Sequence, residues 1–173
     1  MSLFTKKENS SYINEEHIKR IKGDGNCAPR AISERLSKEY VVDHESFRNA
    51  VVEHLRKINN REDIGINDYY LGEMSKLGKH FDGIEINASM KIVNSLGYKL
   101  IIWQCEGDSL YTKRKGLDQN DNYDKEINLI YNGNGFHGHY DLYLPDKSKS
   151  CTSLVSRRND QMSSLELRKK EQE

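Results

Sequence analysis

The sequence predicts an α+β domain in which a helical first half is followed by a strand-rich second half. Two observations support this class. Apolar residues recur at helical spacing in four segments of the first half, and three short runs of β-branched and aromatic residues follow in the second half. Because helices and strands are segregated along the chain, we expect N-terminal helices packed around a small, mostly antiparallel or mixed β-sheet.

Each expected helix has a stripe of apolar residues three or four positions apart. The first begins at Asn26 or Cys27, and Pro29 suits its first turn, where backbone N–H groups are spare. Gly97 provides the end of the fourth. The stripes are Ala28, Ile32 and Leu36; Phe47, Val51, Leu55 and Ile58; Tyr70, Met74 and Leu77; and Ile86, Met90 and Val93.

The expected strands are residues 99–104, 126–131 and 139–144, and the longest polar loop between them is 106–125. Residues 15–145 therefore form one domain in this interpretation. We expect residues 1–14 to be a flexible N-terminus. We expect residues 146–173, which are polar and charged, to be a disordered tail or a terminal helix.

Composition excludes several classes of function. Lys plus Arg equals Asp plus Glu at 27 each, so the chain lacks the basic footprint of a nucleic-acid binder. No run approaches the ~18 apolar residues of a membrane helix, and the N-terminus lacks the apolar core of a secretory signal. The three cysteines suit neither a disulfide framework nor a zinc site. We expect the protein to work in the cytoplasm. That cytoplasm is the host cell's if the protein comes from a pathogen or symbiont that delivers it there.

Cys27 follows a sharp polar turn, residues 23–26, and begins a helix. The partial positive charge of a helix N-terminus favours a thiolate over a thiol. Successive backbone amides of the Asp24-Gly25-Asn26 turn can form a nest that would stabilise an oxyanion. The alternative is an ordinary small buried cysteine, so a catalytic interpretation requires a base.

His139 is the candidate base. On a strand, His139 and Asp141 share one face, about 7 Å apart at Cα, while residues 140, 142 and 144 point into the core. A carboxylate so placed can orient an imidazole, as in a Cys-His-Asp triad. Nearby glycines at 133, 135 and 138 give the strand a flexible approach and leave room for a substrate backbone.

Two other interpretations of this segment stay open. His139 could be a surface histidine at a strand end. Alternatively, His137, His139 and Asp141 could bind a metal, although the sequence names no fourth donor for such a site.

Three blocks together resemble the OTU (ovarian tumour) family of deubiquitinases. Residues 24–27 and 30–32 match the family's cysteine box, D-G-N-C-L-F-R-A-I, position by position. Residues 81–88 are similar to its W-G-G-x-x-E-L-x-A-L segment, and residues 138–141 to its H-Y-(D/N) histidine box. The blocks occur in the family's order, and the resemblance covers residues 15–145.

The resemblance implies a papain-like OTU core and a cysteine-type deubiquitinase, a thiol protease that hydrolyses isopeptide bonds at the C-terminus of ubiquitin or a ubiquitin-like protein. It assigns Cys27 as nucleophile, His139 as base and Asp141 as the orienting acid, with the amides of residues 24–27 as the oxyanion hole. It implies no metal or cofactor. The expected partner is ubiquitin or polyubiquitin, bound by a monomer without nucleic acid or membrane insertion. The alternatives are a catalytically silent ubiquitin-binding module and another papain-like thiol hydrolase.

Overall fold

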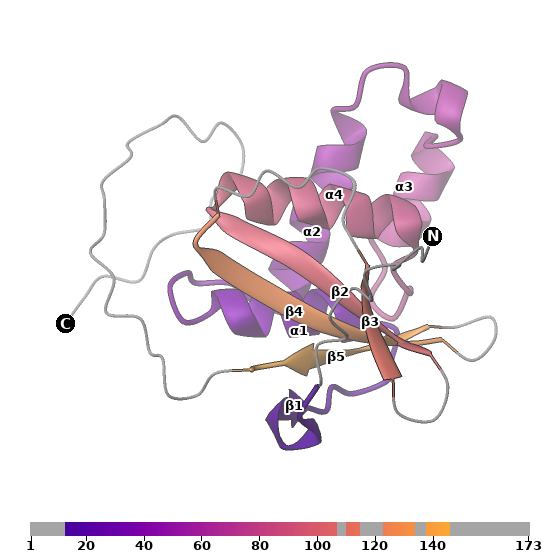
Figure 1. The fold of residues 1–173 in the computed structure, drawn as a ribbon. Coiled ribbons are helices and arrows are strands. Elements are labelled where there is room, and N and C mark those ends of the chain that lie inside the picture. The colour runs from indigo at the N-terminus through magenta and orange to yellow at the C-terminus, as the bar shows by residue number, and fades with distance from the viewer. Residues whose placement is uncertain (1–12, 107–109, 115–122, 134–137, 146–173) are drawn as a thin grey trace, which may run out of the picture.

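The structure, a computed structural model, describes residues 13–106, 110–114, 123–133 and 138–145. Helices cover one face of a twisted sheet, and the short helix α3 stands away from the sheet in an arm that follows α2 (Figure 1). The helices are α1 (Cys27–Leu36), α2 (His44–Arg56), α3 (Asp68–Met74) and α4 (Gly83–Ser95), with 3-10 turns η1 (Glu15–His17) and η2 (Arg61–Ile64). The strands are β1 (Ile18–Lys19), β2 (Tyr98–Glu106), β3 (Leu110–Arg114), β4 (Lys125–Asn132) and β5 (His139–Tyr143).

The sheet has five strands in the order β1-β5-β4-β2-β3. Among the strands that the structure describes, only β2 and β4 pair in parallel; the other three pairings are antiparallel. The expected α+β class with a mixed sheet is therefore confirmed. In the β4–β5 ladder, Asn132 pairs with His139 and Ile130 with Asp141, which fixes the register of the histidine strand.

The main core lies between the helices and the sheet. Helix α1 packs against β4 and β5, and α4 packs against β2 (Figure 1). The apolar stripe of α1 is buried as its spacing predicts, and so is that of α2 as far as Leu55; Ile58 lies beyond the end of α2 and is only partly buried. Tyr140 and Leu142 of β5 join this core from the sheet. A smaller apolar cluster lies on the opposite face of the sheet: Ile13, Ile101, Trp103, Ile130 and Tyr143.

Three expectations about the elements were wrong. The loop expected at 106–125 contains β3, which forms an antiparallel hairpin with β2. Leu77 follows the end of α3 instead of extending its stripe, and it is 53% exposed. Ile13, expected within a flexible N-terminus, is buried in the smaller cluster because it covers the sheet face opposite the helices. The expected tail, residues 146–173, lies outside the described residues.

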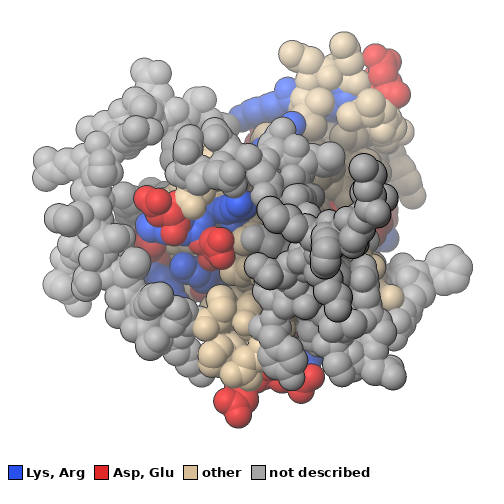
Figure 2. Space-filling model, in the orientation of Figure 1, with Lys and Arg blue, Asp and Glu red and all other residues tan. Residues whose placement is uncertain are grey.

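The described surface mixes both signs of charge. Figure 2 shows Lys and Arg side chains beside Asp and Glu side chains on the part of this face that belongs to described residues, in keeping with equal numbers of the two kinds in the sequence. Within the same described residues, no helix is both long and apolar enough to cross a membrane.

Candidate active site

The turn before Cys27 is held in shape by Asp24. One carboxylate oxygen of Asp24 accepts the backbone N–H of Asn26 at 3.1 Å, and the other accepts Nη2 of Arg30, one turn into α1, at 2.8 Å. Burial alone would raise the pKa of Asp24, but the Asn26 amide and the cations Arg30 and Lys22 outweigh it and lower the pKa. Asp24 is therefore an anion that ties the turn to the helix.

Gly25 has no room for a side chain. Its φ is +79°, in the left-handed region, and a Cβ there would lie 1.9 Å from the carbonyl oxygen of Gly78. The turn thus packs backbone against backbone on the loop between α3 and α4. The side-chain oxygen of Asn26 adds to this contact by accepting the Gly78 N–H at 2.8 Å.

Cys27 is the first residue of α1 and is only 2% exposed. Burial raises the pKa of its thiol, and backbone N–H groups of Tyr140, Ala28 and Cys27 itself offset only part of this effect. The amides of Ala28 and Cys27 at the helix N-terminus favour the thiolate as expected, but burial outweighs them, so the pKa of the thiol in the free protein lies above its ordinary value. The contact with Tyr140 nevertheless places the thiol against the first residues of β5.

His139 and Asp141 interact as the strand pattern predicts. Nε2 of His139 lies 2.9 Å from Oδ1 of Asp141, and the two side chains are 30% and 2% exposed. With Nε2 engaged by a carboxylate, the neutral imidazole carries its proton on Nε2 and presents a lone pair on Nδ1. Nδ1 faces the turn, 3.5 Å from where a Cβ on Gly23 would stand.

Asp141 is anchored by a segment that sequence reasoning missed. The backbone N–H of Ile21 donates to Oδ1 at 2.8 Å, and Nη1 of Arg20 donates to Oδ2 at 2.9 Å. Burial opposes the charge of Asp141, but the Ile21 amide, His139 and Arg20 prevail and lower its pKa. The two-residue strand β1 delivers these donors by pairing with β5. A strand so short has no sequence period from which to infer its partner.

The structure thus brings the turn at 23–26, Cys27, His139 and Asp141 to one place. Of the four amides expected in an oxyanion nest, that of Asn26 donates to Asp24, which leaves those of Asp24, Gly25 and Cys27 as candidates. No cluster of three or more His, Cys, Asp and Glu side chains suited to a metal occurs among the described residues. The metal alternative requires His137, which lies outside them, as does Cys151.

Two of the glycines before His139 leave space for the aromatic ring of Tyr131. A Cβ on Gly138 would stand 2.0 Å from a ring carbon of Tyr131, and one on Gly133 would stand 2.5 Å from another. The Tyr131 ring also packs on Tyr140, with centroids 5.0 Å apart. Room for this ring, rather than for a substrate, accounts for these two glycines; Gly135 lies outside the described residues.

Arg48 is the second group that sequence reasoning missed. It lies on α2, is fully buried, and its guanidinium contacts the Phe81 ring, with Cζ 4.9 Å from the centroid. Nη1 donates to the carbonyl of Met74 at 3.0 Å. Nη2 lies 3.2, 3.0 and 2.6 Å from the Gly25 carbonyl, the Asn26 side-chain oxygen and the Lys79 carbonyl. The available signal was an arginine on the apolar side of α2, beside Phe47 and three residues before Val51.

Several solved structures share this fold. The OTU domain of OTUD1 is similar over 73% of this chain and 84% of its own, with a TM-score of 0.57 and 18% identity. An OTU deubiquitinase from Wolbachia pipientis wMel, bound to ubiquitin, is similar over 74% of this chain and 94% of its own, with a TM-score of 0.53 and 17% identity. The Hazara virus OTU, also bound to ubiquitin, gives a TM-score of 0.50 at 17% identity, over 73% of this chain and 81% of its own.

The chain therefore has the fold of OTU domains, as its three sequence blocks led us to expect. No family model matches the sequence. No curated protein matches it either.

Proposed function

We propose that this protein is a cysteine-dependent deubiquitinase that hydrolyses isopeptide bonds at the C-terminus of ubiquitin or a ubiquitin-like protein. The observation that carries the proposal is the Asp141–His139 pair, with 2.9 Å between Oδ1 and Nε2, on the strand whose Tyr140 N–H contacts the buried thiol of Cys27. The OTU fold adds support, since the similar Wolbachia deubiquitinase is itself bound to ubiquitin.

In the proposed reaction, Nδ1 of His139 takes the proton of the Cys27 thiol, and the sulfur attacks the carbonyl carbon of the ubiquitin C-terminus. The carbonyl oxygen becomes an anion, which backbone amides of residues 24, 25 and 27 would stabilise. The carbon–nitrogen bond then breaks, and the imidazolium returns its proton to the lysine amine that leaves. Water attacks the thioester with His139 as base again, which releases the ubiquitin carboxylate and the Cys27 thiol.

Asp141 would support both proton transfers by holding His139 in the right tautomer and by stabilising its charged form. Because burial raises the pKa of Cys27, the thiol is neutral in the free protein, and its deprotonation depends on His139. The mechanism needs no metal or cofactor.

The burial of Cys27 favours one second candidate, a catalytically silent ubiquitin-binding module. A ubiquitin with a C-terminal propargyl group separates the two. The deubiquitinase proposal expects one covalent adduct, mapped by mass spectrometry to Cys27, that persists in Cys105→Ser and Cys151→Ser and disappears in Cys27→Ala. Binding without an adduct would support the silent module. Alkylation of Cys27 by iodoacetamide but not by the ubiquitin probe would favour a different thiol hydrolase.

Variants of the base and its partner refine this test. We expect His139→Ala to abolish cleavage of di-ubiquitin and Asp141→Ala to leave a measurable remnant, since loss of the orienting acid is the milder loss in triad enzymes. His137→Ala should be close to neutral. Complete loss in His139→Ala and Asp141→Ala alike, together with damage in His137→Ala, would instead favour the metal interpretation. A gel of di-ubiquitin of each linkage type, incubated with each folded variant, provides the measurement.

A further inference from the structure

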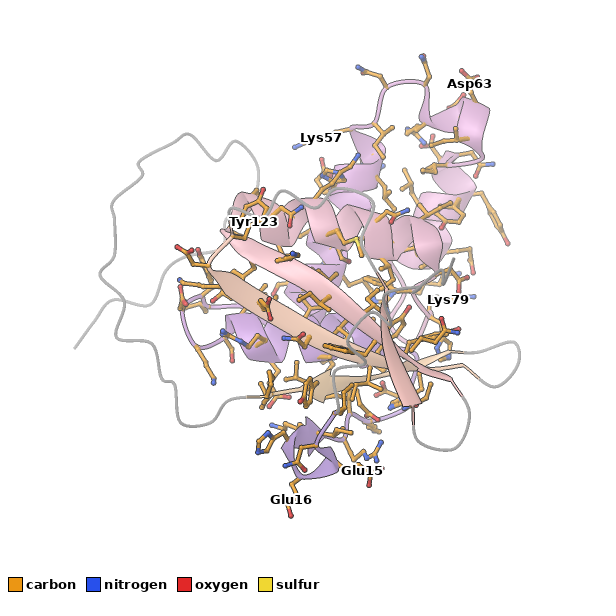
Figure 3. All side chains as sticks on the ribbon, viewed as in Figure 1. Glu15, Glu16, Lys57, Asp63, Lys79 and Tyr123 are labelled. Carbon is orange, nitrogen blue, oxygen red and sulfur yellow. The ribbon has the colours of Figure 1, made fainter. Side chains whose placement is uncertain are left out.

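Arg48 and Asn26 hold together segments that are far apart in the sequence. The guanidinium of Arg48 reaches the turn at 23–26, the last residue of α3 and the carbonyl of Lys79. Lys79 is labelled in Figure 3, at the end of the molecule where β5 begins. A planar fork with five N–H donors can serve acceptors in several directions at once, whereas a lysine ammonium cannot reproduce that geometry.

These contacts fix one peptide plane. The carbonyl of Gly25 accepts Arg48, and the N–H of the same peptide, on Asn26, donates to Asp24. In a trans peptide these two groups point in opposite directions, so rotation of the plane would break both hydrogen bonds. Without these two hydrogen bonds, the peptide between Gly25 and Asn26 could rotate easily, because Gly25 has a positive φ and no side chain to restrict it.

The side chain of Asn26 is fixed as well. Both groups that contact its Oδ1, Nη2 of Arg48 and the N–H of Gly78, are donors, so the oxygen rather than the amide nitrogen must face them. Asn26 is only 7% exposed and immediately precedes Cys27. The position of Asn26 therefore determines where α1 begins, and it thereby also determines where the thiol of Cys27 lies.

The surroundings of the Arg48 guanidinium indicate that this residue fixes the geometry of the turn rather than adding to stability. The hydrogen-bond acceptors of the fully buried guanidinium are neutral carbonyl and amide oxygens. Burial of this charge outweighs the attraction of the carboxylates of Glu85 and Asp24, so it costs stability relative to an apolar side chain of similar size. What the arrangement provides is a single orientation of the turn and of its amides before substrate arrives, which is the condition for stabilising an oxyanion.

We propose that Arg48 and Asn26 are positioning residues that lock the turn at 23–26 onto the α3–α4 loop and so hold Cys27 and the oxyanion amides in their reactive arrangement. This inference rests on the proposed function, because the arrangement is reactive only if Cys27 is the nucleophile. Neither residue is required to touch the substrate.

The test compares Asn26→Ala, Asn26→Asp and Arg48→Lys with two matched controls. Asn128→Ala removes a buried asparagine oxygen on β4 that accepts the Trp103 indole N–H at 3.0 Å. Arg61→Lys removes an arginine fork that joins the Ile66 carbonyl to Asp68 in the α2–α3 arm. Asn26→Asp keeps the oxygen that accepts both donors and so serves as the conservative rescue.

Turnover of ubiquitin carrying a C-terminal aminocoumarin is measured well below the lowest melting temperature of the set. We expect Asn26→Ala and Arg48→Lys to lower kcat roughly 10- to 100-fold, the scale of loss from misplaced reacting groups, with KM nearly unchanged. Asn26→Asp should recover most of this loss, and the two controls should lower only the melting temperature. A wild-type kcat in Asn26→Ala, or equal kcat losses in the controls, would overturn the inference.

Hydrogen exchange provides a readout that does not depend on ubiquitin. Asn26→Ala and Arg48→Lys should raise exchange together in peptides covering residues 23–28 and 75–80, and Asn128→Ala should not. If the wild-type protein fails to act on ubiquitin but this paired change is seen, the proposed substrate is wrong and the locking contact stands. If exchange rises in only one of the two segments, the contact does not couple them and the inference fails.

Discussion

Asp141 is a structural anchor as well as the proposed orienting acid of His139. It accepts the Ile21 amide, Arg20 and His139, which come from the two ends of the described chain. These bonds stabilise its charged form, so the pKa of Asp141 is lowered despite burial. The carboxylate that would orient His139 therefore also contributes to the stability of the fold.

This linkage predicts how stability depends on pH. A carboxyl group whose pKa is lower in the folded than in the unfolded state stabilises the protein above its unfolded pKa of about 3.9, and the contribution is lost as pH falls through the lower folded value. We expect Asp141→Asn to unfold more easily than the wild type at pH 7, with the difference shrinking below about pH 4. Urea unfolding at pH 7, 5, 4 and 3 measures this. A difference that stays constant over this range would show that the charge of Asp141 does not contribute.

At the scale of elements, the contact between the cysteine turn and the α3–α4 loop depends on a glycine. Gly25 and Gly65 both have positive φ, at +79° and +83°, but their surroundings differ. A Cβ on Gly65 would meet nothing within 4 Å, whereas one on Gly25 would overlap the backbone of Gly78. The two positions therefore separate the cost of backbone conformation from the cost of a steric clash.

We expect Gly65→Ala to lower the free energy of unfolding by about 1 kcal/mol, the cost of a left-handed alanine. Gly25→Ala should cost about 3 kcal/mol or more, because the clash adds to the same conformational term, and it should abolish turnover. Denaturant unfolding and the aminocoumarin assay provide the two measurements. Similar losses in both variants would mean that the turn can move away from Gly78.

Sequence reasoning succeeded where a pattern repeats within one element. The stripes of α1, α2 and α4 and the alternation of β5, which gave the His139–Asp141 pair, are all local periodicities. Sequence reasoning failed where a feature depends on how two elements pack or pair with each other. Strand β3 lies in a stretch rich in polar residues and pairs with β2, and the contacts of Arg48 with residues 25 and 79 depend on how α2 packs. The burial of Cys27, which reversed the expected direction of its pKa, has the same origin.

For the whole molecule, the proposed domain of residues 15–145 is closed by its last described residues. The N–H of Leu144 donates to the carbonyl of His17 at 2.9 Å, directly after β5. The sequence beyond Pro145 contains few apolar residues, which is the basis for expecting that it adds little to the core.

We therefore expect a chain that ends at Lys147 to keep its melting temperature within about 2 °C and its full turnover, since removal of exposed polar chain changes stability little. Thermal unfolding and the aminocoumarin assay on the shortened and full-length proteins provide the comparison. A loss of several degrees would mean that residues 148–173 pack on the domain and that its boundary lies further on.

The pairing of β1 with β5 also sets an order in time. The amide of Ile21 and the carboxylate of Asp141 are 120 residues apart, so a chain growing from its N-terminus makes the proposed nucleophile early and the proposed base and orienting acid much later. Until β5 has been synthesised and has docked, Cys27 lacks its proposed base, and the edge of β4 that will pair with His139 is open. Under the proposed function, a chain interrupted before residue 139 would therefore be inactive, and activity would arise only when β5 completes the sheet.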